Sequence, residues 1–245
     1  MGRIKKNTFL LILLTVGLCL GGLYILVIPP WQSPDEPTHF EYAAVLAKGD
    51  RFWSPRPDPA LQKRIIASLD RFDYWRWVGE DRPEPLPETF RTAPFLSAAY
   101  SQIGKNPPGY YLSAALILKA IGSDLLLPGL YLLRFLSLCF SLLTVSFVYL
   151  SARRIFPGRR RFCLATGAFA VFLPQFLVIG TSVSPDPLIN LSGAVVIYFS
   201  LRFQQTGFSA SGILLLLVLS GAGLLISYKF LMLLPALLFV GCFLS

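Results

Sequence analysis

Long apolar stretches alternate with short polar segments along most of the chain. About 20 apolar residues in a helix cross the ~30 Å hydrocarbon core of a membrane, and several of these stretches approach that length. We therefore expect an all-α integral membrane protein with about six transmembrane helices. They are predicted near residues 9–28, 131–150, 162–180, 188–203 and 211–227, with a sixth that starts at Phe230 and is truncated at Ser245.

A long polar segment separates the first and second predicted spans. It divides the chain into three predicted parts, which are residues 1–28 with the N-terminus and first span, 29–127 as an extracytoplasmic loop, and 128–245 with the remaining spans. In the loop, the apolar residues that follow Pro107 and end at Ile121 are too few to cross a membrane. We predict a juxtamembrane or re-entrant helix there, with Asn106 as its cap and Pro107 in its first position.

Two other parts of the loop have a recognisable pattern. Residues 82–94 are dense in proline, which breaks helices and removes backbone donors, so this segment is predicted to be irregular. Residues 71–77 mix aromatic rings with charges. This mixture suits either a helix at the lipid headgroups or a sugar-stacking surface, and the headgroup interpretation is favoured.

The net charge of +9 is concentrated beside the ends of predicted spans, at residues 3–6 and 153–161. Lysine and arginine in such places mark the cytoplasmic side and anionic lipid. This distribution predicts a cytoplasmic N-terminus and argues against nucleic acid as a partner. Every acid except Asp186 lies in the predicted loop. The four cysteines lie in apolar stretches at wide spacing, which indicates neither a disulfide framework nor a metal site.

The only histidine and two adjacent carboxylates follow the first predicted span, in the stretch Trp31-Gln32-Ser33-Pro34-Asp35-Glu36-Pro37-Thr38-His39-Phe40. Ser33 stands three residues before Glu36, with Pro34 in the first helical position, which is the pattern of a capping box. In such a helix Glu36 turns back to the cap, and Asp35 and His39 lie on one face. A well-capped interfacial helix, with Asp35 near the positive end of the helix dipole, explains the stretch equally well.

The predicted topology brings several polar residues to the extracytoplasmic face, namely Asp35, His39, Asn106, Arg134, Asp186 and Lys229. Some have simpler explanations as well. Arg134 can snorkel to the interface, Asp186 can cap the fourth span, and Lys229 needs only an anion or the interface. The asymmetry between the two faces nevertheless predicts an active site at the outer face.

Two motifs carry a resemblance to a known family, Ser33-Pro34-Asp35-Glu36-Pro37-Thr38-His39-Phe40 and Asn106-Pro107-Pro108-Gly109-Tyr110-Tyr111. Through them the chain resembles the N-terminal half of GT-C membrane glycosyltransferases, such as protein O-mannosyltransferases and the lipid A aminoarabinose transferase. It looks closest to a related bacterial family of predicted membrane proteins with the same Pro-Asp-Glu-x-x-His-Phe string. The resemblance implies a GT-C-like helical bundle in the bacterial cytoplasmic membrane.

The resemblance also implies roles for individual residues. Asp35 would be the catalytic base that activates an acceptor hydroxyl, with Glu36 supporting it. Residues of the Pro-Pro motif and later basic residues would hold the phosphate of a polyprenyl-phosphate sugar. The motif here begins with Asn106 in place of the family's His or Lys, so Lys105 or Lys229 would have to supply the charge. The set implied for the donor and substrate is Lys105, Asn106, Arg134, Asp186 and Lys229.

The leading hypothesis is therefore a glycosyltransferase that moves a sugar from a polyprenyl-phosphate donor to a glycan, lipid or protein acceptor. Its chemistry needs a base on the hydroxyl and cations on the leaving phosphate, which these residues supply. A flippase for lipid-linked saccharides and a non-catalytic fragment or assembly partner are the alternatives. No cofactor is required. A divalent metal, Mg or Mn, held by Asp35 and His39 with help from Glu36, is the minority interpretation.

Overall fold

The computed structural model describes residues 8–50, 56–93, 96–97, 100, 106–122 and 125–233, and every regular element among them is a helix. The chain forms two compact units, which we consider separately. The loop unit comprises Ile25–Leu136 and Ser182–Pro185. The bundle unit comprises Met1–Tyr24, Ser137–Thr181 and Asp186–Ser245.

The helical composition confirms an all-α membrane protein, with two helices long and apolar enough to span, α1 (Thr8–Val27) and α7 (Leu126–Ile155). A third span results if α8 (Arg160–Phe172) and α9 (Pro174–Gly180) count as one, with a bend of 61°. α10 (Asp186–Thr206) is long enough but too polar, and α11 (Ala210–Ile226) has only 17 residues. The described helices thus supply two or three candidate spans, and six spans stay a prediction.

The remaining boundaries differ from the expected ones. α7 extends about one turn beyond the predicted second span at each end. The predicted sixth span begins as a short 3-10 helix, η1 (Tyr228–Leu233), and its remainder lies outside the described residues. The break between α8 and α9 falls at Leu173, which is extended (φ −77°, ψ 111°) because the residue before a proline avoids the helical region.

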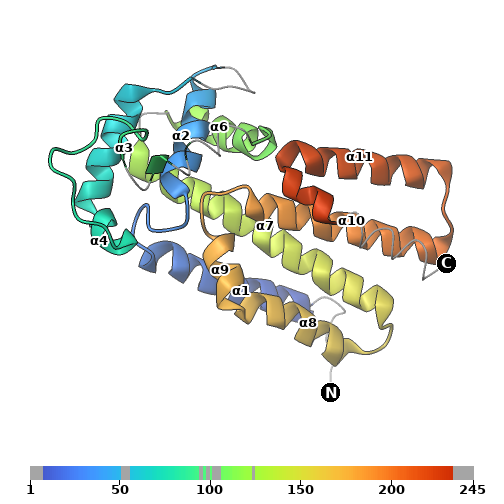
Figure 1. Ribbon diagram of the computed structural model, residues 1–245. Coiled ribbons are helices and arrows are strands. Elements are labelled where there is room, and N and C mark those ends of the chain that lie inside the picture. The colour runs from blue at the N-terminus through green and yellow to red at the C-terminus, as the bar shows by residue number, and fades with distance from the viewer. Residues whose placement is uncertain are drawn as a thin grey trace. The chain divides into compact units, whose positions relative to one another are not determined.

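Glycine allows close packing of helices in the bundle unit. Gly17 and Gly21 lie one turn apart on α1 and face α7, and a Cβ on Gly17 would come 2.9 Å from Leu142 Cδ2. A Cβ on Gly21 would collide with Leu138. Small residues at this spacing let helices approach closely in a membrane. α10 and α11 run antiparallel beside each other in the same unit (Figure 1).

Substituting Gly21→Val should therefore destabilise the bundle unit by about 1–3 kcal/mol, since extra carbon atoms have no room at this position. Gly22→Val is the matched control, because no atom lies within 4 Å of a Cβ there. Both changes alter helix propensity equally, so the difference in thermal unfolding midpoint between the two purified variants reports packing alone. Equal midpoints would contradict the close contact between α1 and α7.

The loop unit is built around α2 (Glu36–Ala47), whose residues from Glu36 to Leu46 are all buried. α6 (Gly109–Ile121) packs along it, and α3 (Pro59–Arg71) and α4 (Tyr74–Val78) complete the unit (Figure 1). The predicted short apolar helix is thereby confirmed as α6. Residues 79–93 contain no helix, as the proline content predicted.

Candidate functional site

The start of α2 does not form the predicted capping box. The helix begins at Glu36, and the residue before it, Asp35, has a left-handed backbone (φ 55°) with no side-chain capping bond. The Glu36 N–H donates to the Ser33 carbonyl at 3.3 Å. The Ser33 hydroxyl is buried and has no hydrogen-bond partner in the described part of the chain. The prediction was wrong because the Glu36 carboxylate turns away from the cap toward a distant arginine.

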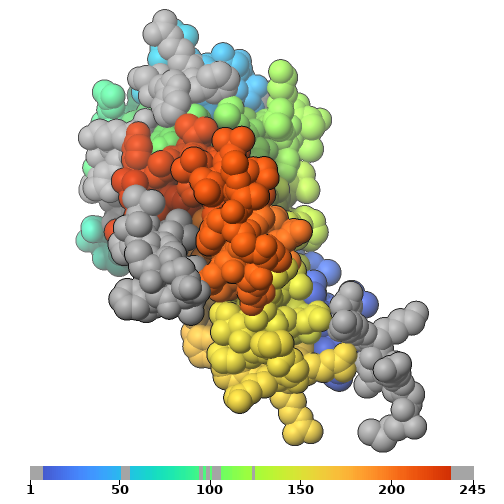
Figure 2. All heavy atoms as spheres, turned by 90° about the vertical axis from the view of Figure 1, so that its right-hand side faces the viewer, coloured from blue at the N-terminus to red at the C-terminus, as the bar shows by residue number. Residues whose placement is uncertain are grey.

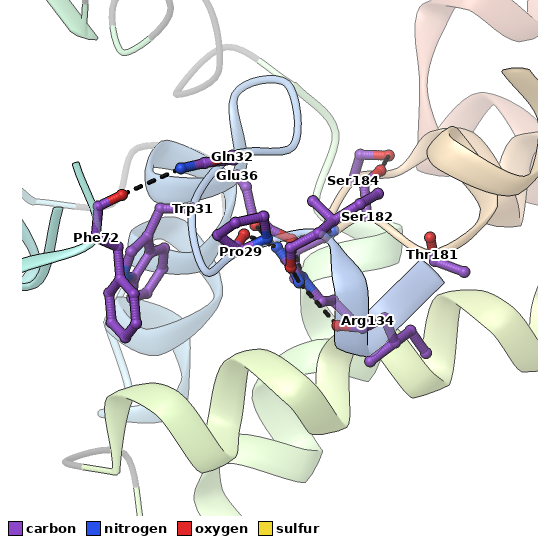
Figure 3. Close-up of polar contacts among 12 residues, drawn as sticks. Pro29, Trp31, Gln32, Glu36, Phe72, Arg134, Thr181, Ser182 and Ser184 are labelled. Carbon is purple, nitrogen blue, oxygen red and sulfur yellow. Dashed lines mark hydrogen bonds and ion pairs between the residues drawn. The ribbon is translucent and has the colours of Figure 1, made fainter. Parts of the chain in front are cut away.

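That arginine is Arg134 of α7, and the two side chains form a buried ion pair (Figure 3). Arg134 Nε lies 2.9 Å from Glu36 Oε1, and Nη2 lies 2.7 Å from Oε2. The backbone N–H of Val183 donates to Oε1 as well, at 3.2 Å. The exposed fractions of the two side chains are 1% and 0%. Burying charges is tolerable only when they are paired and fully hydrogen-bonded, as they are here.

Arg134 also binds the carbonyl groups that α1 leaves open at its C-terminal end. Nη1 donates to Ile25 O at 3.2 Å and to Ile28 O at 2.7 Å, and Nη2 donates to Pro29 O at 2.9 Å. The guanidinium has five N–H donors, and all five have acceptors within the loop unit. The ion pair therefore ties together the end of α1, through Arg134, and the segment around Val183, through Glu36 at the start of α2. No donor of Arg134 is left for a phosphate in this arrangement.

Asp35 is the accessible carboxylate of the motif. Its residue is exposed, in contrast to the buried Glu36 beside it. Its backbone carbonyl accepts the Thr38 hydroxyl at 2.8 Å and the His39 N–H at 3.1 Å, which keeps it bound to the first turn of α2. Burial and, secondly, the charge of Asp35 raise the pKa of Tyr74, so the Asp35 carboxylate lies near that ring.

His39 belongs to a buried cluster with residues of α6 and the segment before it. Its Nδ1 lies 2.7 Å from the Tyr111 hydroxyl. Asn106 Nδ2 donates to the same hydroxyl at 3.4 Å, and the Tyr42 ring stacks on the Tyr111 ring at 4.0 Å. Asn106 does not cap the helix as predicted, because α6 begins later, at Gly109, with no side-chain capping bond. Lys105 lies outside the described residues.

In the bundle unit, the predicted Asp186 and Lys229 form an ion pair, with Nζ 2.8 Å from Oδ1. Asp186 is the first residue of α10, where a helix dipole favours an acid. Lys229 lines one end of a groove of about 730 Å³ between α7, α8 and α10. Thr144, Ile189 and Ala194 contribute to its walls, which are mainly apolar.

The residues around Asp35 and His39 do not fit the divalent metal, Mg or Mn, of the minority interpretation. The described residues contain no group of three or more His, Cys, Asp or Glu side chains that could hold an ion. The Glu36 carboxylate binds Arg134, and His39 Nδ1 contacts Tyr111. The described residues therefore do not offer a set of ligands for a divalent metal.

Glu41 is a buried acid on α2 that was not predicted as a functional residue from the sequence. Its Oε1 accepts Gln62 Nε2 at 3.0 Å and the Asp58 N–H at 3.3 Å, and Gln62 Oε1 accepts the Phe90 N–H at 3.1 Å. Burial raises the pKa of Glu41 from its ordinary 4.5 to about 7, although these two hydrogen bonds lower it. Its position between Phe40 and Tyr42 in the sequence was the one indication that this acid is buried.

This pKa predicts that the stability of the loop unit falls as the pH rises from about 4.5 to 7 and is constant above that range. The folded state holds the Glu41 proton more tightly than the unfolded state, so raising the pH favours unfolding in this window. Glu41→Gln retains the accepting oxygen and removes the titration. At pH 8 this variant should be more stable than the wild type by up to about 3 kcal/mol.

Thermal unfolding midpoints at pH 5 and pH 8 test this prediction. The difference between Glu41→Gln and the wild type should grow with pH, whereas exposed Glu80→Gln should follow the wild type at both values. A difference that stays constant would mean that Glu41 does not titrate in this range.

Comparison with known proteins shows the family of the chain. A model of the family described as "Predicted membrane protein (DUF2142)" matches residues 18–243. No curated protein and no solved structure matches the chain. Since the matched residues cover nearly the whole sequence, the chain belongs to the DUF2142 family of predicted membrane proteins.

Proposed function

We propose that the protein is a membrane glycosyltransferase of the GT-C type, which moves a sugar from a polyprenyl-phosphate donor to an acceptor hydroxyl. The observation that carries the proposal is the contrast within the Asp35-Glu36 pair. Asp35 is exposed, whereas Glu36 is fully buried against Arg134. A buried, fully bonded ion pair directly beside an exposed carboxylate is an arrangement that holds the carboxylate in a fixed place for catalysis.

In the proposed reaction Asp35 accepts the proton of the acceptor hydroxyl, and the oxygen of that hydroxyl attacks the anomeric carbon of the sugar. The bond from that carbon to the phosphate oxygen breaks, and the polyprenyl phosphate leaves with the electron pair. A single displacement of this kind inverts the anomeric configuration. The acceptor belongs to a glycan, a lipid or a protein.

Glu36 and Arg134 have a positioning role in this proposal. This positioning role replaces the catalytic and phosphate-binding roles that the family resemblance implied for the two residues. Both carboxylate oxygens and all five arginine donors already have partners in the loop unit. The pair holds the backbone of Asp35 between the end of α1 and the first turn of α2. It acts on the reaction through Asp35 and does not touch the substrate.

The groove in the bundle unit suits the donor lipid. Its apolar walls accept a prenyl chain, and Lys229 at its end supplies a cation for the phosphate. The Lys229 side chain is 63% exposed and is held by Asp186 alone among the described acids. A lysine in these surroundings can exchange its carboxylate partner for a phosphate. The six-span topology and the bacterial cytoplasmic membrane, with the N-terminus in the cytoplasm, are part of the same proposal.

Purified protein incubated with labelled polyprenyl-phosphate sugars tests this function directly. We expect release of polyprenyl phosphate together with transfer of the sugar to an acceptor from a membrane extract. A donor that stays intact in the presence of folded protein, across hexose and pentose donors, would overturn the assignment.

Lys229→Gln should weaken donor binding, raising the KM for the donor by about tenfold or more, because a hydrogen bond to a charged group contributes about 1.5–3 kcal/mol. Arg202→Gln is the control, since Arg202 is also exposed on the bundle unit but does not line the groove. The KM is obtained from initial rates at varied donor concentration. An unchanged KM would remove Lys229 from the donor site.

A further inference from the structure

The turn between α7 and α8 carries a positive charge that has no acid nearby in its own unit. Five arginines lie within residues 153–161, namely Arg153, Arg154, Arg159, Arg160 and Arg161. The only acid in the sequence of the bundle unit is Asp186. Asp186 pairs with Lys229 and stands at the opposite end of α10 from Gln205, which contacts Arg154.

Among the residues that the structure describes, these arginines have no acidic partner. Arg154 donates to the Tyr198 hydroxyl at 3.2 Å and to Gln205 Oε1 at 3.1 Å, and both acceptors are neutral. Its Nε is buried and has no acceptor among the described residues. Arg153 lies over the Tyr149 ring. Arg159, Arg160 and Arg161 are exposed. In Figure 2 the atoms at this end of the bundle unit, in yellow, lie on the face toward the viewer.

The same end is where the groove reaches the surface between apolar side chains. Ile155, Phe156 and Phe162 line it, and Ile155 and Phe162 are about half exposed. The Phe156 and Phe162 rings are in edge contact, with centroids 4.6 Å apart. Arginines are thus sequence neighbours of the residues that line this apolar opening, a combination that matches a molecule with an anionic head and a hydrocarbon chain.

We propose that this end of the groove binds an anionic phospholipid, with the phosphate of its headgroup on the arginines of the α7–α8 turn and one acyl chain in the groove. The acyl chain packs against Ile155, Phe156 and Phe162 at this end of the groove, which leaves the Lys229 end to the proposed donor, and these contacts stabilise the bundle unit. The site differs from the proposed donor site at Lys229, because Lys229 pairs with Asp186 at the start of α10, whereas Arg154 contacts Gln205 near the other end of that helix, about 28 Å away along its axis.

Charge and shape together select this ligand class. A soluble polyanion would use the arginines but would leave the apolar opening unfilled. A zwitterionic phospholipid would fill the opening, but its net charge is zero and it would not compensate the arginines. An anionic phospholipid satisfies both, and each lysine or arginine near an anionic lipid surface contributes about 1 kcal/mol.

The test is native mass spectrometry of the detergent-purified protein, titrated with phosphatidylglycerol or phosphatidylcholine. We expect the wild type to retain phosphatidylglycerol in preference to phosphatidylcholine. The triple variant Arg159→Gln, Arg160→Gln, Arg161→Gln should bind phosphatidylglycerol roughly 100-fold more weakly, since three such arginines contribute about a factor of five each. The thermal unfolding midpoint without added lipid confirms that each variant is folded.

A second triple variant, Arg71→Gln, Arg76→Gln, Arg91→Gln, removes the same charge from exposed positions of the loop unit. It should bind phosphatidylglycerol as the wild type does. Equal weakening by both triple variants, or no preference of the wild type for phosphatidylglycerol, would overturn the proposal. So would equal binding of glycerophosphoglycerol, which has the headgroup without the chains. Sugar transfer is not measured in this experiment, so its result is independent of the proposed function.

Discussion

Replacing Arg134 with methionine will lower the free energy of unfolding by about 3–5 kcal/mol, because the Glu36 carboxylate then stays buried without a cation. Both side chains are at most 1% exposed, so water does not reach the carboxylate in the folded state. The carbonyl groups of Ile25, Ile28 and Pro29 lose their donors at the same time. The end of α1 and the start of α2 should therefore lose their contact with α7 in the same step.

Unfolding curves of purified variants in detergent measure this loss, and three further variants locate its cause. Glu36→Leu combined with Arg134→Met should be more stable than Arg134→Met alone, since no charge remains buried. Arg134→Lys should lie in between, because lysine has three donors in place of five. Arg91→Met, at an exposed position of the same unit, should stay within about 0.5 kcal/mol of the wild type. If the stability of Arg134→Met also stays that close to the wild-type value, the ion pair does not stabilise the loop unit.

Asp35→Asn will reduce sugar transfer by about 10²–10⁴-fold, the usual contribution of a general base. The amide has nearly the same shape as the carboxylate but does not accept the proton of the acceptor hydroxyl. Asparagine is one of the few residues that tolerate a left-handed backbone, so the φ of 55° at this position should persist. The unfolding midpoint and the KM for the donor should therefore change little while kcat falls.

Asp73 offers a closely matched control for this experiment. It is also exposed, precedes a helix, has a left-handed backbone (φ 52°) and makes no side-chain capping bond. Asp73→Asn should transfer sugar at the wild-type rate. Retained transfer by Asp35→Asn, or an equal loss in both variants, would exclude Asp35 as the base. The exposure of its carboxylate would then not support a catalytic role.

Much of the fold was predictable because apolar length is a local property of a sequence. The first span is confirmed as the candidate span α1, the second as the longer helix α7, and the apolar residues before Ile121 as the short helix α6. The irregular segment after Gly79 follows from its prolines. The predicted caps at Ser33 and Asn106 were wrong, because both assumed that the nearest backbone groups would satisfy these side chains.

The candidate site was predictable only in part. The motif around Asp35 and the residues Arg134, Asp186 and Lys229 stand out in the sequence as polar groups beside apolar stretches. The ion pair between Glu36 and Arg134 joins residues 98 positions apart, and no local pattern indicates it. The role of Glu41 is likewise a result of burial by α3 and the segment near Phe90.

The sequence by itself therefore determined the class of this protein and the places where its polar residues interrupt the apolar stretches, since hydropathy and helix signals act over one turn to one span. Only the tertiary structure decided which of two neighbouring carboxylates is buried and which is exposed. The physical reason is that a buried charge is stable only beside a fitting partner. Arg134, supplied by a distant helix, is that partner for Glu36, and Asp35 remains at the surface.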